Sequence, residues 1–257
     1  MNSTYILETR GLTKEFKGFV AVDRVNLKVR RGTIHALIGP NGAGKTTCFN
    51  LLTKFLTPTR GKILLDGEDI TGESSARIAR RGVVRSFQIS AVFPHLTLLE
   101  NVRIALQRTL GTSFDFWRSE RSLGRFNDRA LELLHAVDLA AYAHLPAVEL
   151  SYGRKRALEI ATTLAMDPQL MLLDEPTQGM GIEDVDRVRQ LIKKVAAERT
   201  VLMVEHNMSV VSSIADTITV LTRGAVLAEG TYSSVSRDPQ VIAAYMGGSG
   251  ATLKGAH

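Results

Sequence analysis

The stretch Gly39-Pro40-Asn41-Gly42-Ala43-Gly44-Lys45-Thr46 decides the fold. Its two outer glycines are separated by four residues, and a lysine and a hydroxyl residue follow the second one. Glycine allows the backbone to turn tightly, so that several N–H groups converge on one phosphate. The lysine can then reach the β- and γ-phosphates, and the hydroxyl can ligate Mg²⁺. We therefore expect residues 39–47, including Thr47, to bind a nucleoside triphosphate.

The flanking residues support this interpretation. Residues 33–38 are strand-like, and residues 46–52 have the pattern of a helix that ends before Pro58. A helix that begins at the loop directs its positive dipole end toward the phosphates. The alternative, a glycine-rich turn without a ligand, does not explain this context. The sequence thus predicts an α/β core with a phosphate loop between a strand and a helix.

A second motif lies far downstream, where the apolar run 170–173 ends in Asp174 and Glu175. Many buried strands end in an acidic residue, so this pattern alone is weak. Together with a phosphate loop in the same chain it indicates catalysis of phosphoryl transfer. Asp174 is then expected to hold Mg²⁺, and Glu175 to orient or deprotonate the attacking water.

Composition narrows the class of protein. The 257 residues carry a net charge of +6, which suits nucleotides, nucleic acid or acidic lipid, although many proteins without such partners are as basic. No apolar stretch approaches the ~18 residues of a membrane-spanning helix. The single cysteine, Cys48, excludes an intramolecular disulfide. With no secretory signal visible at the N-terminus, we expect a cytoplasmic location.

Between the two motifs, Leu150-Ser151-Tyr152-Gly153-Arg154 resembles the signature motif of the ATP-binding-cassette family. Tyr152 stands where that motif has a glycine, and Arg154 stands where it has a glutamine. The resemblance implies that Ser151, Tyr152 and Gly153 contact the γ-phosphate of ATP held by an opposite subunit.

Further motif residues of that family occur in the expected order along the chain, two before the signature motif and others after it. The resemblance implies that Gln88 senses Mg²⁺ and the attacking water, that His206 stabilises the γ-phosphate, and that Phe16 stacks on adenine. Gly181 replaces the usual aspartate of the D-loop, the segment that follows Glu175 and meets the partner subunit. The predicted catalytic residues are Glu175, His206, Lys45 and Gln88, and the predicted Mg²⁺ ligands are Thr46, Gln88 and Asp174.

The family resemblance implies a P-loop NTPase core of the RecA-like type, with an N-terminal antiparallel β subdomain and an inserted α-helical subdomain. We divide the single ATPase domain into a nucleotide-binding core (1–88 and 167–246), a helical subdomain that bears the signature (89–166) and a flexible tail (247–257). In the helical part, Thr97 and Glu100 form a capping-box pattern.

The run LSYGRKRALEIA, the long insert before it and the C-terminal VIAAYMG are similar to the larger ATP-binding protein of bacterial branched-chain amino-acid importers. This resemblance implies ATP and Mg²⁺ as ligands and a second ATP-binding subunit, identical or paralogous. It also implies two transmembrane permease subunits, an indirect solute-binding partner and a peripheral place at the cytoplasmic face of the membrane. Transport of urea, amides or lipid remains an alternative. A nucleic-acid-associated cassette is disfavoured, because the chain has one cassette and no sustained heptads.

The insert also contains a cluster whose role the sequence leaves open. Three aromatic residues precede four arginines at helical spacing: Phe114, Phe116, Trp117, Arg118, Arg121, Arg125 and Arg129. Either the arginines contact lipid headgroups or the membrane partner, or they form a solvated helix face over packed aromatic rings.

Overall fold

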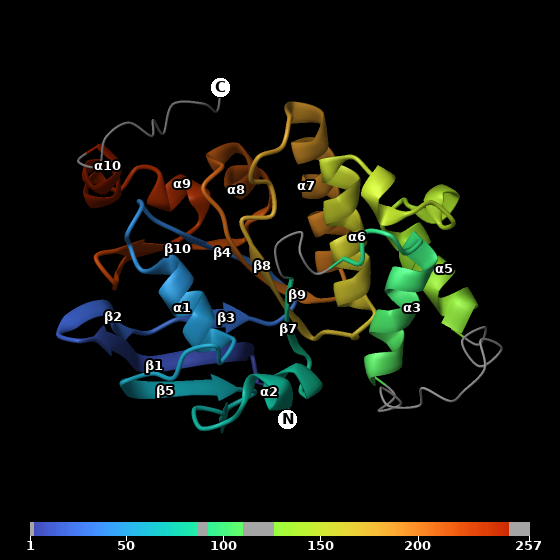
Figure 1. The fold of residues 1–257 in the computed structure, drawn as a ribbon. Coiled ribbons are helices and arrows are strands. Elements are labelled where there is room, and N and C mark those ends of the chain that lie inside the picture. The colour runs from blue at the N-terminus through green and yellow to red at the C-terminus, as the bar shows by residue number, and fades with distance from the viewer. Residues whose placement is uncertain (1–2, 87–91, 110–125, 247–257) are drawn as a thin grey trace.

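The computed structural model describes residues 3–86, 92–109 and 126–246 (Figure 1). Its centre is a six-stranded sheet with the order β11-β10-β4-β9-β8-β7. Five of these strands are parallel, and β11 pairs with β10 in the antiparallel sense. The bounds are β4 Ile34–Ile38, β7 Val83–Ser86, β8 Leu170–Asp174, β9 Thr200–Val204, β10 Thr217–Thr222 and β11 Ala225–Gly230.

The middle strands are mostly apolar because both faces of this sheet are covered. All residues of β4 and β9 are buried. Leu37, Leu172 and Leu202 face a core shared with α1 and the second sheet, whereas their neighbours face the core beneath α6, α7 and α8. The carboxyl ends of the parallel strands therefore meet at one edge, and the loops after β4, β8 and β9 lie there together.

The second sheet is antiparallel and covers α1 (Lys45–Leu52) from the other side (Figure 1). Alternation of apolar and polar residues over 5–10 predicts a strand, and β1 confirms it and continues to Phe16. The same alternation at Val25, Leu27 and Val29 predicts one further strand, which is wrong, because the chain leaves β2 at Val25 and re-enters the sheet only at Lys28. The bounds are β1 Tyr5–Phe16, β2 Phe19–Val25, β3 Lys28–Arg30, β5 Arg60–Leu65 and β6 Glu68–Asp69.

Among the described residues between β7 and β8, most lie in helices (Figure 1). The predicted capping box is confirmed, because the Thr97 hydroxyl accepts from the Glu100 N–H at 3.2 Å and the Glu100 carboxylate accepts from the Thr97 N–H at 2.8 Å. The helices here are α3 Leu98–Thr109, α5 Asn127–Ala136, the short 3-10 turns η3 Ala140–Tyr142 and η4 Ala147–Glu149, and α6 Tyr152–Leu164.

The other helices of the described residues lie before β7 or after β8 in the chain. They are α2 Ser75–Arg80, α7 Ile182–Ala196, α8 Met208–Ile214, α9 Tyr232–Val235 and α10 Pro239–Met246. In the part of the chain that the structure describes, no helix has the length and apolar character needed to cross a membrane.

Several sequence-based predictions fall outside the described residues. They concern Gln88, the tail 247–257 and most of the aromatic and arginine cluster of the insert. Only Arg129 of that cluster is described. It lies on α5 and forms an exposed ion pair with Glu132 at 2.8 Å.

Candidate functional site

The phosphate loop connects β4 to α1, as predicted, and its conformation requires glycine at two places. Gly39 and Gly44 have φ values of 152° and 95°, a region that residues with side chains rarely adopt. A Cβ atom at Gly44 would lie 2.4 Å from the Ala21 carbonyl oxygen, and one at Gly39 would lie 2.2 Å from the Leu221 carbonyl oxygen. The loop therefore lies directly against the neighbouring backbone, with no space for side chains at either end.

Lys45 is the first residue of α1, and its side chain lies over the loop. Its Nζ donates to the carbonyl oxygens of Gly39 and Pro40, at 2.7 and 2.9 Å. Burial lowers the pKa of Lys45, and the nearby carboxylate of Glu175 opposes that shift. The N-terminal N–H groups of α1 and this cation together form an environment that favours phosphate.

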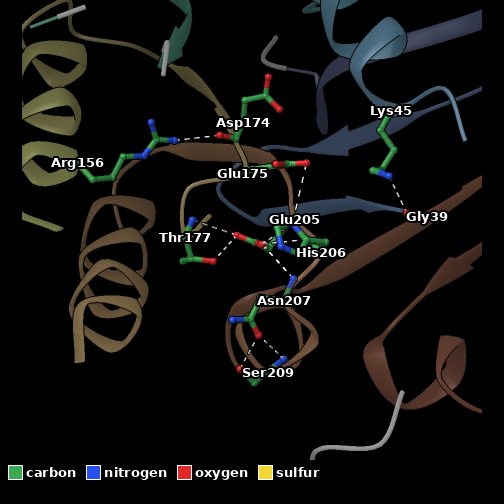
Figure 2. Close-up of polar contacts among 10 residues, drawn as sticks. All are labelled: Gly39, Lys45, Arg156, Asp174, Glu175, Thr177, Glu205, His206, Asn207 and Ser209. Carbon is green, nitrogen blue, oxygen red and sulfur yellow. Dashed lines mark hydrogen bonds and ion pairs between the residues drawn. The ribbon is translucent and has the colours of Figure 1, made fainter. Parts of the chain in front are cut away.

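Two carboxylates follow each other at the end of β8, yet they point in different directions (Figure 2). Asp174 forms an ion pair with Arg85 of β7. Glu175 has a φ of 44°, a left-handed conformation that is unfavourable for a side-chain-bearing residue, and its N–H donates to the Val204 carbonyl oxygen at 2.9 Å. Such local strain is typical of functional positions. The turn directs the Glu175 carboxylate toward the loop after β9.

His206 lies in that loop, with its Nδ1 4.0 Å from Oε1 of Glu175. The imidazole is half-exposed, whereas Glu205 beside it is completely buried. Thus the structure brings together two of the residues predicted to be catalytic, from the loops after β8 and β9, and places Glu175 near enough to Lys45 to influence its pKa.

The signature residues form the start of α6. The Ser151 hydroxyl caps the helix by accepting from the Arg154 N–H at 3.5 Å, while the backbone at Gly153 packs so closely on Asp184 of α7 that a Cβ would lie 2.5 Å from its carboxylate. Tyr152 is exposed. Among the described residues, no hydrogen bond or ion pair joins Ser151, Tyr152 or Gly153 to the phosphate loop of the same chain.

Arg154, where the signature pattern has glutamine, makes an intramolecular contact. Its guanidinium lies 4.2 Å from the centre of the Tyr142 ring and donates to the Tyr142 hydroxyl at 2.8 Å. A second arginine, Arg156, joins α6 to β8, because its Nη2 donates to the Asp174 carbonyl oxygen at 3.1 Å.

The other predicted ligands lie at the surface around the loop. Phe16 ends β1 and is exposed, with the Lys14 ammonium 5.0 Å from its ring centre. Asn41, Gly42 and Thr46 are exposed, whereas Ala43 is buried. Gln88 lies outside the described residues, so the structure does not place it.

The oxygen atoms of Thr46 and Asp174 are donors of the kind that Mg²⁺ prefers. Within the described residues, no three acidic, histidine or cysteine side chains form a metal-binding group by themselves. These residues fit a Mg²⁺ ion that takes its remaining ligands from nucleotide oxygens and water.

Sequence reasoning did not assign a role to Arg85 or Glu205. Arg85 bridges the carboxylate of Asp174 and the side-chain oxygen of Asn50 on α1. Glu205 accepts four hydrogen bonds from the loops that carry Glu175 and His206. A charged residue directly after the apolar strand 200–204 was the available signal, but its partner Thr177 is 28 residues away in sequence.

The comparison with protein families fits this geometry. The family model described as ABC transporter matches residues 22–178, from before the phosphate loop to beyond Glu175. The chain belongs to the ABC transporter family. As an ABC ATPase it is an ATP hydrolase. A second model, described as branched-chain amino acid ATP-binding cassette transporter, matches residues 225–251.

Individual relatives agree with the family. The ABC ATPase is 44% identical to the high-affinity branched-chain amino acid transport ATP-binding protein BraF of Pseudomonas aeruginosa, over 94% of this chain and 98% of the relative. Its fold is similar to the ADP conformation of MJ1267, an ATP-binding cassette of an ABC transporter, with a TM-score of 0.84 and 29% identity over 95% and 100% of the two chains. A dimeric post-hydrolysis cassette, MJ0796 bound to ADP and Pi, has a TM-score of 0.72 and 28% identity over 88% and 98%.

Proposed function

We propose that this ABC ATPase powers the import of branched-chain amino acids as a peripheral subunit at the cytoplasmic face of the membrane. The observation that carries the choice of solute is the 44% identity to BraF together with the match of residues 225–251 to the branched-chain amino acid cassette model. Residues that contact the solute belong to the membrane subunits, so the relatives and not the ATP site support this step.

Our proposal assigns ATP to Phe16, the loop 39–47 and Gln88. The backbone N–H groups of the loop and the Lys45 ammonium hold the phosphates, and Phe16 stacks on the base. Thr46, Asp174 and Gln88 would hold Mg²⁺, which neutralises charge on the phosphate oxygens when it is bound. The tight backbone at Gly39 and Gly44 supports this assignment, since a side chain at either position would collide with a neighbouring carbonyl oxygen.

Glu175 acts as the general base or orienting group for the attacking water, and His206 stabilises the γ-phosphate oxygens in the transition state. Support comes from the 4.0 Å separation of their side chains and from the nearby Lys45. The three groups lie at the start of α1 and in the loops after β8 and β9, which meet at one edge of the sheet. A strained Glu175 backbone sets the direction of that carboxylate.

A second ATP-binding subunit completes the site. Ser151, Tyr152 and Gly153 make no polar contact with the phosphate loop of their own chain within the described residues, so we assign them to the ATP of a partner. The dimeric state of the MJ0796 relative supports this arrangement. Closure on ATP and release after hydrolysis then drive two permease subunits.

The test is a pull-down from native membranes with a tagged Glu175→Gln chain and ATP, analysed by mass spectrometry. Recovery of a polytopic membrane subunit and a second cassette is expected, and transport assays on that complex with radiolabelled leucine then test the solute. Recovery of ribosomal or DNA-bound proteins in place of membrane subunits would contradict the transporter assignment and leave the ATPase intact. A complex that moves urea, short amides or lipid but not leucine would overturn the solute alone.

A further inference from the structure

A buried carboxylate lies between the two loops that carry the proposed catalytic pair (Figure 2). Glu205 has none of its surface exposed. One oxygen, Oε1, accepts from the backbone N–H groups of His206 and Asn207 at 2.9 and 3.0 Å. The other, Oε2, accepts from the hydroxyl and the N–H of Thr177 at 2.8 and 3.3 Å. Both oxygens are therefore used, and each serves a different loop.

The donors to this carboxylate are uncharged. Among the described residues no lysine or arginine lies within ion-pair distance of Glu205, and the one basic side chain that does is His206, whose Nδ1 is 3.7 Å from Oε1. Loss of one donor from a buried carboxylate is costly, because its solvation is not replaced by water. The two loops are consequently held to one geometry around Glu205 while its hydrogen bonds persist.

The loop on the Oε2 side, residues 175–181, begins at the hydrolysis site and contains the partner-facing D-loop. Thr177 follows Glu175 by two positions, and the N–H of Gln178 donates back to the Glu175 carbonyl oxygen at 3.1 Å. The Met180 N–H in turn donates to the Thr177 carbonyl oxygen at 3.4 Å. A displacement of the D-loop therefore acts directly on Thr177, and through its hydroxyl on Glu205.

The loop on the Oε1 side carries His206. Because Oε1 holds the N–H groups of His206 and of the next residue, the orientation of the His206 backbone depends on the position of the Glu205 carboxylate. Asn207 separately caps α8 by accepting from Ser209 at 3.1 Å. The cap of α8 is thus provided without Glu205, whose carboxylate is left to join the two loops.

We propose that Glu205 is a positioning residue that transmits the position of the D-loop, through the Thr177 hydroxyl, to His206. Docking of a second subunit against the D-loop thereby fixes the spacing between His206 and Glu175, and hydrolysis proceeds only in the paired state. This inference rests on the proposed roles of Glu175 and His206. It adds a path by which the inter-subunit contact reaches them, independent of the aspartate that Gly181 replaces.

The test uses two nearly isosteric changes and their combination in the full chain. Thr177→Val removes the hydroxyl donor and keeps the N–H, and Glu205→Gln replaces one acceptor oxygen by an amide NH₂. A matched control is Thr219→Val, which removes another buried hydroxyl that donates to a carboxylate, that of Glu229 at 2.7 Å. Thr219 lies on β10, and its hydroxyl also forms a hydrogen bond with Nε2 of His35 on β4 at 2.8 Å. Neither His35 nor Glu229 lies in the loops of Glu175 and His206. Melting temperature, affinity for a fluorescent ATP analogue and steady-state kcat are measured for each protein.

Thr177→Val is expected to lower kcat by about tenfold, the effect of one hydrogen bond to a charged group, while nucleotide affinity changes less than about twofold. Because both changes break the same relay, the double variant should be no more than about twofold slower than the slower single variant. Thr219→Val should have a lower melting temperature and an unchanged kcat. If Glu205→Gln fails to fold, the comparison of kcat between Thr177→Val and Thr219→Val still tests the relay.

A kcat of Thr177→Val within about twofold of the wild type would overturn the relay, as would rate losses that multiply in the double variant. Equal losses of kcat in Thr177→Val and Thr219→Val would mean that Glu205 has a purely structural role, and this result would also overturn the relay. Failure of the underlying function is a distinct outcome, since the wild-type chain itself would then hydrolyse no ATP or Glu175→Gln would turn over normally.

Discussion

Replacing Arg156 by methionine tests how much the buried contacts between α6 and the end of β8 stabilise the fold. Arg156 Nη1 lies 2.6 Å from Oε2 of Glu159, and the two side chains are only 4% and 2% exposed. Its Nη2 also donates to the Asp174 carbonyl oxygen. Methionine fills a similar volume but leaves the Glu159 carboxylate in the interior without this cation.

The magnitude follows from the burial of the pair. Removing one partner of a buried ion pair costs about 3–5 kcal/mol, a large share of the ~5–15 kcal/mol that stabilises a typical domain. For a chain of this size the melting temperature should fall by roughly 6–20 °C. Burial raises the pKa of Glu159 and Arg156 opposes that shift, so the variant should raise it further. A carboxyl with a raised folded-state pKa is destabilising once ionised, so the deficit should grow as the pH rises above the ordinary glutamate pKa of 4.5.

Urea unfolding followed by circular dichroism, at several pH values, measures this deficit. The double variant Arg156→Met/Glu159→Leu serves as the control, because replacing both charges by apolar groups removes the unpaired carboxylate. We expect it to recover most of the lost free energy of unfolding and to lose the added pH dependence. A single variant within about 1 kcal/mol of the wild type, or a double variant less stable than the single, would refute the reasoning.

Three further changes test other parts of the structure. Gly44→Ala should abolish binding of a fluorescent ATP analogue with the fold retained by circular dichroism, since its Cβ would lie 2.4 Å from the Ala21 oxygen; normal affinity would show that the loop tolerates a side chain. Burial lowers the pKa of His35 from 6.5 to about 4, so the unfolded chain takes up a proton before the folded chain does as the pH falls. The free energy of unfolding should therefore decrease by about 1.4 kcal/mol for each pH unit by which the pH is lowered from 6.5 towards 4. A His35→Gln variant should lack this component, and identical profiles of unfolding free energy against pH would contradict it. Burial raises the pKa of the Cys48 thiol to about 12, so a thiol reagent at mildly alkaline pH should react only after denaturation; rapid labelling of the folded chain would be inconsistent with it.

Local patterns account for the parts of the fold that the sequence predicted. The phosphate loop, the acidic end of β8 and the capping box at Thr97 each depend on residues close together in the chain. By contrast, β2 begins with Phe19 and Val20, both exposed, so its apolar run lacks the alternation that indicates a half-buried strand.

The contacts that organise the site were not predictable in the same way. Arg85 and Asp174 are 89 residues apart, and Thr177 and Glu205 are 28 residues apart. Their pairing depends on the strand order of the central sheet, which places β7 beside β8 and β8 beside β9. The family resemblance identified Glu175 and His206 by position, but only the three-dimensional structure shows the buried carboxylate of Glu205 between their loops.

The most direct test of the central claim is the steady-state rate of phosphate release by the Glu175→Gln chain at saturating ATP, compared with the wild type. If Glu175 activates the attacking water, the rate should fall by about 10²- to 10⁴-fold while the affinity for ATP is retained. Turnover close to that of the wild type would contradict the assignment of Glu175 and, with it, the mechanism built on the Glu175–His206 pair.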